Sequence, residues 1–486
     1  MNIGVVSRII SKLLMIEGVS MLLPMLVGLF YGEQDYIYFL GVGLVCVAVG
    51  FAGSCAWKKK DKSRTIILVR DGIAIVTFGW ILFSFFGGAP FYLSGYIPNV
   101  SEAFFETVSG FTTTGASVLS SVEALSKCML FWRSFTHWLG GMGILVFTVA
   151  ILPGLDVGSF QIMKAECSGP VSEKIMPRVK DAAKTLYLIY MGFTLVEIVL
   201  LMLGGMDWFE ASTHTFGTVG TGGFGIYNDS TARFSAFSQW VITIFMLLCN
   251  VNFSLYYLVL RGRWREVVRD EETRFFFLVV LGSGLLITID LVARQVFAGG
   301  VGDALRHAYF QVGTVISTTG FATCDFDLWP SFSKTVLFVL FFFGGCAGST
   351  GGGPKSIRVL VALKVVKQSI TKIVHPRAVA PVKVNGKPVK EETINVIFGF
   401  LAMYAIFMML GTAAVTALED VSIFDGFMMI AATLGNVGPG FGVVGPTCNY
   451  GGFSDLTTWI LSFMMLAGRL EIYTVIALFF PSFWKK

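Results

Sequence analysis

Four short stretches rich in threonine and glycine recur along the chain, and their residue types suit the binding of an ion. They read FTTTGAS (111–117), TVGTGGF (218–224), ISTTGFA (316–322) and LGNVGPG (434–440). Backbone carbonyls can replace the hydration shell of an alkali cation. Glycine supplies the unusual dihedral angles that aim carbonyls inward, and β-branched threonine stiffens the backbone while adding a hydroxyl. The chemistry that these stretches predict is cation coordination.

The four stretches align without gaps, which predicts four equivalent glycines: Gly115, Gly222, Gly320 and Gly438. Before each lies a segment of about ten residues, which as a helix spans about 15 Å and can enter a membrane without crossing it. Non-helical backbone at membrane depth is tolerated only where it is buried in protein or lines a water-filled cavity. We therefore expect four re-entrant loops that converge on one axis, with the partly negative ends of the short helices near it. The alternative, close helix packing, predicts small residues four apart along full helices instead.

Membrane-spanning helices must position these loops. The chain has 486 residues, of which 55% are hydrophobic and 14% charged, whereas soluble domains are roughly 45–50% apolar and about 25% charged. Apolar runs of about 20 residues recur, each long enough to cross the roughly 30 Å hydrocarbon core. Arg8 and Lys12 precede an apolar segment that we interpret as a first membrane helix rather than a cleaved signal peptide. A β-barrel would instead show short alternating segments.

One pattern occurs four times: an apolar helix, a short amphipathic segment, a Thr/Gly stretch, a second apolar helix and a basic loop. We expect the first helices near 65–86, 185–203, 275–297 and 394–417, and the second near 131–152, 238–260, 334–363 and 457–480. A helical hairpin near 9–31 and 36–57 precedes them. The predicted bounds are 1–63 for this hairpin and 64–163, 164–260, 261–363 and 364–486 for the repeats. The predicted fold is an all-α polytopic membrane protein with four helix–pore-loop–helix repeats around a pseudo-fourfold pore.

The basic residues gather in connecting segments. Residues 58–64, 164–184, 261–274 and 355–390, with Arg8, Lys12, Lys485 and Lys486, hold 28 of the 36 lysines and arginines. The positive-inside rule places these segments and both termini in the cytoplasm. This distribution argues against nucleic acid as the partner; segment 355–390 suits anionic lipid head groups or a cytosolic protein. The remaining connections carry carboxylates that would concentrate cations outside: Glu102, Glu106, Asp207, Glu210, Asp303, Asp325, Asp327, Glu419, Asp420 and Asp425.

Two features that follow the third and fourth stretches predict a gate. The segment GGCAGSTGGG (344–353) contains six glycines, each of which destabilises a helix by roughly 1 kcal/mol relative to alanine. They are Gly344, Gly345, Gly348, Gly351, Gly352 and Gly353. Pro354 stands where a phosphate-binding loop needs lysine, so we predict a flexible loop that constricts the pore, with a static kink as the alternative. Arg469 lies near the centre of the last apolar run, where a charge must face a water-filled cavity or a carboxylate on another helix.

At these residues the sequence resembles the Trk/Ktr superfamily of potassium transporters. TLGNVGPGFG (433–442), FGTVGTGGFG (216–225) and FTTTGAS are close to that family's filter segments, and the resemblance covers essentially the whole chain. It implies a homodimer in the bacterial cytoplasmic membrane, a nucleotide-binding regulatory ring on the cytosolic face and a gate at the glycine-rich loop. Because sodium-conducting members often carry serine at the first glycine, Gly115 favours potassium. The potassium ligands that it implies are Thr113, Thr114, Gly220, Thr221, Thr318, Thr319, Asn436 and Val437, with the four aligned glycines.

Two other classes of protein are alternatives to a pore. A secondary carrier coupled to protons or sodium would carry discontinuous helices in two corresponding halves, whereas this chain has four repeats in one orientation. A membrane enzyme would need a metal-ligand spacing or a nucleophile–base pair, and the sequence offers neither. We therefore predict a non-enzymatic protein with potassium as transported substrate and no organic cofactor. His137, His214 and His307 are candidate proton relays, although single histidines near membrane interfaces are more often structural.

Overall fold

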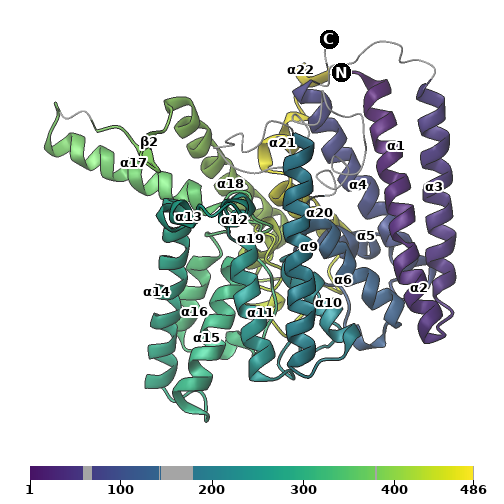
Figure 1. Ribbon diagram of the computed structural model, residues 1–486, viewed down its shortest axis with the longest axis horizontal. Coiled ribbons are helices and arrows are strands. Elements are labelled where there is room, and N and C mark those ends of the chain that lie inside the picture. The colour runs from purple at the N-terminus through teal and green to yellow at the C-terminus, as the bar shows by residue number, and fades with distance from the viewer. Residues whose placement is uncertain (59–67, 142, 144–178, 378–379, 485–486) are drawn as a thin grey trace.

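The computed structural model of the chain describes residues 1–58, 68–141, 143, 179–377 and 380–484 (Figure 1). Within this part of the chain, six helices are long and apolar enough to cross a membrane, and a bent pair forms a seventh candidate span. The predicted repeat boundaries at 63/64 and 163/164, the basic residues at 59–64, most of those at 164–184, and Lys485 and Lys486 lie outside the described residues. The mostly helical, multi-pass membrane architecture predicted from composition is confirmed.

The N-terminal hairpin forms as predicted. Helix α1 (Ile3–Ser20) continues into α2 (Leu22–Tyr31), and the chain turns through Gly32 into α3 (Tyr36–Lys58). A Cβ on Gly18 would lie 2.6 Å from the carbonyl oxygen of Gly43, so α1 and α3 pack backbone against backbone. Small residues permit this close approach, which replaces the hydrophobic effect as the source of helix association in lipid.

Each of the four repeats begins with a long helix and then a short one. The long helices are α4 (Val69–Leu93), α9 (Val179–Leu203), α14 (Glu271–Ala293) and α18 (Glu391–Leu418). The short ones are α5 (Val100–Phe111), α10 (Trp208–Val219), α15 (Gly300–Ile316) and α19 (Ile423–Leu434). Three of the short helices have 12 residues, a rise of about 18 Å, so they end inside the membrane as predicted.

The second helices of the four repeats are α6 (Lys127–Gly141), α11 (Ala236–Cys249), α16 (Ser331–Leu340) and α20 (Asp455–Arg469). Those of the last three repeats are shorter than the sequence predicts. The prediction of continuous helices over 238–260 and 457–480 is wrong: α12 (Phe253–Leu260) is bent by 93° from α11, and α21 (Ile472–Ala477) begins after Glu471, which has a φ of 62°. The start of α12 has a local cause, because Asn252 accepts a hydrogen bond from the Ser254 amide and caps the new helix. Residues 144–152, which we predicted to continue α6, lie outside the described residues.

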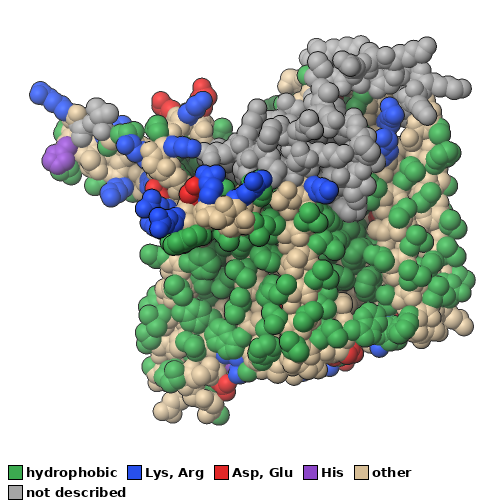
Figure 2. Space-filling model, in the orientation of Figure 1, with side chains coloured by type: hydrophobic (Ala, Val, Ile, Leu, Met, Phe, Trp, Pro, Cys, Tyr) green, Lys and Arg blue, Asp and Glu red, His purple; other side chains and the backbone are tan. Residues whose placement is uncertain are grey.

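The remaining elements lie mostly at one edge of the molecule, which also carries both termini (Figure 1). They are α13 (Trp264–Arg269), α17 (Ser356–Val374), the hairpin of β1 (Lys383–Val384) and β2 (Lys387–Pro388), and α22 (Pro481–Trp484). Three short 3-10 turns follow the first, third and fourth Thr/Gly stretches: Val122–Ala124, Phe326–Leu328 and Gly442–Val444. Figure 2 shows a broad band of hydrophobic side chains, with lysines and arginines gathered at the edge that holds α13 and α17.

The repeats follow one another around a ring. The short helix of each repeat packs on the second helix of the repeat before it: α10 on α6, α15 on α11, and α5 on α20. The remaining junction, between α16 and α19, is made by aromatic rings, with Phe338 and Phe427 centroids 6.0 Å apart. This cyclic order brings the four Thr/Gly stretches to a common centre.

Candidate cation pathway

The four Thr/Gly stretches share one unusual backbone conformation. A residue with left-handed φ is followed two positions later by a glycine with positive φ. The left-handed residues are Thr113 (55°), Thr221 (55°), Thr318 (56°) and Asn436 (54°), and the glycines are Gly115 (83°), Gly223 (78°), Gly320 (89°) and Gly438 (91°). Threonine rarely adopts a left-handed φ, so its repetition in equivalent places marks a conformation that the surroundings impose.

This geometry corrects the alignment of the second stretch by one residue. Gly223, rather than Gly222, is equivalent to the other three glycines. The hydrogen bonds agree: the Thr114 amide donates to the Ser109 carbonyl (2.9 Å), and the corresponding donor in the second repeat is the Gly222 amide, which donates to Gly217 (2.8 Å). Gly220, a predicted ligand, caps the end of α10 with a right-handed φ of −71°. The Thr-X-Gly spacing common to the first three stretches could have identified this register.

The glycines close the four stretches into a ring. A Cβ added to any of them would lie under 3.0 Å from a carbonyl oxygen of the next repeat. The pairs are Gly115 with Gly222, Gly223 with Thr319, Gly320 with Val437, and Gly438 with Thr114. Each repeat therefore contacts the next and the fourth returns to the first, so only glycine fits at these positions. Each short helix ends within two residues of its left-handed position, which brings four partly negative helix ends to the same centre.

The glycine-rich segment 344–353 forms a loop whose two ends are joined and whose C-terminal end contacts the ring. The Ser356 hydroxyl donates to the Gly344 carbonyl (2.5 Å), which joins the two ends of the loop. The Gly352 amide donates to the Thr318 hydroxyl (2.7 Å), so the loop contacts the third stretch directly. Glu272, in the first turn of α14, accepts hydrogen bonds from the amides of Ala347 (2.7 Å) and of Ile357. This carboxylate thus secures the loop from the side.

Arg469 holds the same loop to the first repeat. Its Nη1 donates to the carbonyl of Thr350 (2.8 Å), and its Nη2 to the carbonyls of Gly140 (2.7 Å) and Gly141 (3.3 Å). The placement near the middle of a spanning helix is wrong, because Arg469 is the last residue of α20. Its position at a break lets the guanidinium turn toward the loop. The positive charge of the guanidinium also interacts favourably with the partly negative C-terminal end of α20.

Two further charged groups, which sequence reasoning missed, lie beside the loop. Lys355 is buried and its ammonium donates to the Gly351 carbonyl. Arg358 pairs with both carboxylate oxygens of Glu471 at 2.6 Å. The signal for Lys355 was its place directly after the glycines, in a segment otherwise interpreted only for its flexibility.

The carboxylates of the opposite face serve largely as structural acceptors. Glu106 is buried and forms an ion pair of 2.6 Å with the buried Arg133, so the pair carries no net charge. Asp327 accepts from the Gly442 amide (2.8 Å). Burial alone would raise the pKa of Glu419, but the hydrogen bonds from Ser454 and Thr457 together outweigh it and lower that pKa. The ion pair with Arg133 thus removes Glu106 from the set of carboxylates expected to concentrate cations, whereas the lowered pKa keeps Glu419 ionised.

The candidate proton relays are placed in structural contacts. His214 Nδ1 lies 2.8 Å from the Glu210 carbonyl of its own helix, and His307 Nδ1 lies 2.8 Å from the Thr323 hydroxyl. His137 lies directly behind the second stretch, between two repeats.

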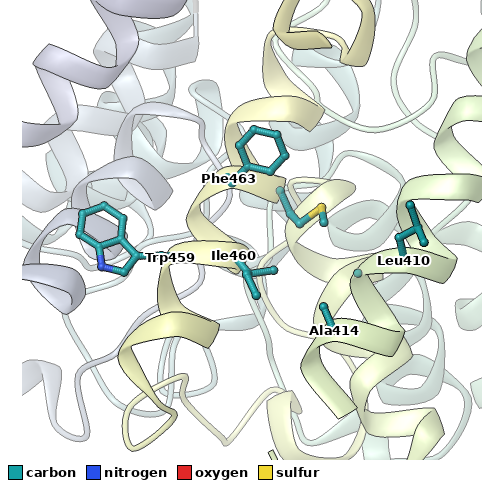
Figure 3. Close-up of a pocket in the computed structure, with 7 residues that line it drawn as sticks. Leu410, Ala414, Trp459, Ile460 and Phe463 are labelled. Carbon is teal, nitrogen blue, oxygen red and sulfur yellow. The ribbon is translucent and has the colours of Figure 1, made fainter. Parts of the chain in front are cut away.

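A groove elsewhere on the surface is separate from this pathway. It is lined by Leu410 and Ala414 of α18 and by Trp459, Ile460 and Phe463 of α20 (Figure 3). Its lining is apolar and offers no row of carbonyls or hydroxyls, so it does not suit a bare cation.

A ring of four re-entrant loops, each held between two helices of its repeat, defines a membrane transport protein of the pore-loop class. The chain belongs to the TrkH family, described as cation transport proteins, whose model matches residues 43–486. It is similar to the Trk system potassium uptake protein TrkH of Escherichia coli K12, with 36% identity over 491 residues and 100% of both chains covered. It is also similar to TrkH of Halomonas elongata, with 35% identity over 495 residues and full coverage of both chains.

The fold is similar to the crystal structure of the potassium transporter TrkH from Vibrio parahaemolyticus. The TM-score is 0.89 at 33% sequence identity, and each chain is covered completely. The match confirms the predicted all-α membrane fold. The names of these relatives describe transport rather than catalysis, in agreement with the prediction of a non-enzymatic protein.

Proposed function

We propose that this protein takes up potassium across the bacterial cytoplasmic membrane through a channel-like filter formed by the four-stretch ring. The observation that carries the proposal is the closed cycle of glycine–carbonyl contacts between successive repeats. Carbonyls and hydroxyls of residues 113–115, 221–223, 318–320 and 436–438 are the proposed ligands, with Gly223 added to the predicted set and Gly220 removed. Relatives of full length are named as potassium uptake proteins, which supports potassium as the transported ion.

The proposed gate is the 344–353 loop, held closed by Arg469 and Lys355. The Gly352–Thr318 hydrogen bond places the loop against one filter strand, so a cation leaving the filter on that side would meet the loop. The loop continues directly into α17, which projects from the edge that carries α13 and both termini (Figure 1). A pull on α17 would therefore act on the loop through Ser356 and the Arg358–Glu471 ion pair.

We further propose that the edge with α17 faces the cytoplasm and receives a nucleotide-binding regulatory subunit, and that the protein is a homodimer. The basic side chains at this edge agree with the positive-inside rule (Figure 2). The relatives are named as parts of a Trk system. Anionic lipids are a second proposed partner of the same basic surface.

The test is rubidium tracer uptake into proteoliposomes that hold a potassium gradient, challenged with external sodium. A potassium-selective pore will concentrate rubidium without a co-ion, and external sodium will leave the uptake intact. Uptake that requires a proton or sodium gradient would instead establish the coupled carrier. The Gly115→Ser variant serves as the filter control, because it adds a side chain at a ring contact.

A further inference from the structure

Helix α6 of the first repeat presents a buried histidine to the filter segment of the second. His137 is fully buried, with Nδ1 2.8 Å from the Gly110 carbonyl and Nε2 3.1 Å from the Phe224 amide nitrogen. A backbone amide can only donate, so Nε2 is the acceptor, and the ring proton lies on Nδ1 and is donated to Gly110. Both nitrogens of the neutral imidazole are thereby used, one in each repeat.

The imidazole ring also lies against the filter backbone itself. A Cβ added to Gly222 would overlap the His137 ring, and the ring centroid lies 4.2 Å from that of Phe224. The carbonyl of Gly222 is the one that contacts Gly115 in the closed ring. The imidazole therefore limits how far this carbonyl can retreat from the centre.

One turn earlier on α6, a second side chain holds the same segment. Arg133 Nη1 donates to the Gly225 carbonyl (2.9 Å), and its guanidinium lies 3.6 Å from the centre of the Phe224 ring. Its partner Glu106 accepts from the Val118 amide (2.9 Å), just after the first filter stretch. The end of the second stretch is thus held at Phe224 and at the following Gly225, and the Arg133–Glu106 ion pair connects it to the first stretch.

We propose that His137 is a positioning residue that fixes the Gly222 carbonyl and thereby sets the selectivity of the filter. The inference rests on the proposed function of the ring as a cation filter. This role replaces the candidate role as a proton relay, because a protonated ring would place an N–H against the Phe224 amide. The acceptor at Nε2 is the atom that matters, since it holds the filter segment, whereas Nδ1 anchors the ring to α5.

Two amide variants distinguish the hydrogen bond at Nε2 from the one at Nδ1. The His137→Gln side chain can reach the place of Nε2 and accept from Phe224, whereas that of His137→Asn reaches only the place of Nδ1. We would measure the potassium-to-sodium permeability ratio of the purified protein from bi-ionic reversal potentials in planar bilayers. We expect His137→Asn to lower the ratio about fivefold, the size of one buried hydrogen bond, and His137→Gln to keep most of it.

The matched control is His214→Gln, since His214 is equally buried but bonds to the Glu210 carbonyl of its own helix; its ratio should match the wild type. Equal ratios in wild type, His137→Asn and His137→Gln would overturn the inference. So would an equal fall in both His137 variants, which indicates packing rather than the Nε2 acceptor. If the wild-type protein itself fails to discriminate potassium from sodium, the proposed filter is refuted instead, so the two failures are distinguishable.

Discussion

Replacing Arg469 by alanine tests whether the guanidinium is a latch on the loop, a barrier to cations, or both. Its two shortest contacts, to the carbonyls of Thr350 (2.8 Å) and Gly140 (2.7 Å), join the loop to the first repeat. A hydrogen bond to a charged group contributes about 1.5–3 kcal/mol. Because Arg469 is only half-buried, we take the lower value for each, or about 3 kcal/mol for the two. Loss of both would lower the closed-to-open ratio roughly 100-fold.

Single-channel recording separates the two roles, because a latch changes open probability and a barrier changes unitary conductance. Arg469→Lys keeps the positive charge, but its compact ammonium cannot span two carbonyls in the fixed geometry of a guanidinium. We expect open probability to rise in both variants, and unitary conductance to rise only in Arg469→Ala. Unchanged open probability in Arg469→Ala, in a protein that still conducts, would refute the latch. Unchanged conductance there would refute the barrier.

Three further substitutions test the filter, the loop contact and the buried ion pair. Gly223→Ala should sharply reduce discrimination against sodium in rubidium uptake, because alanine is strained at this φ by roughly 1–2 kcal/mol and its Cβ meets the next repeat; retained discrimination would contradict the corrected register. Thr318→Val removes the hydroxyl that accepts from the loop and should raise basal rubidium flux roughly fivefold, whereas Thr318→Ser should not; equal fluxes would exclude this contact from gating. Glu106→Gln leaves the Arg133 charge buried and should destabilise the fold by about 3–5 kcal/mol, seen as a lower thermal midpoint in detergent. Glu266→Gln, which disrupts an exposed ion pair, should change that midpoint little, and equal shifts would count against the buried pair.

The sequence by itself determined the class of fold, because the evidence for it is local. A short segment of the chain is enough to recognise each feature: the apolar runs long enough to span a membrane, the shorter helical segments and the Thr/Gly stretches that follow them. The N-terminal hairpin and the four short helices appear close to their predicted positions for this reason. The glycine content of 344–353 likewise predicted the interruption between α16 and α17 without any knowledge of its neighbours.

Tertiary structure decided the features that depend on contacts between distant residues. The register of the second stretch was ambiguous because Gly222 and Gly223 are adjacent, and only the carbonyl of Thr319, in the next repeat, distinguishes them. The end of α11 is likewise held from outside, since the Asn250 side chain donates to the Ser317 carbonyl (3.3 Å) of another repeat.

For the same reason, the sequence could not predict the partners of Arg469 and His137. Hydropathy showed that a charge in the last apolar run needs a partner, but it could not name carbonyls more than a hundred residues away in the chain. A single histidine in α6 carried no periodic signal, and its significance appears only where two repeats meet. Local patterns fix which segments enter the membrane, whereas the closed ring fixes which atoms of those segments face one another.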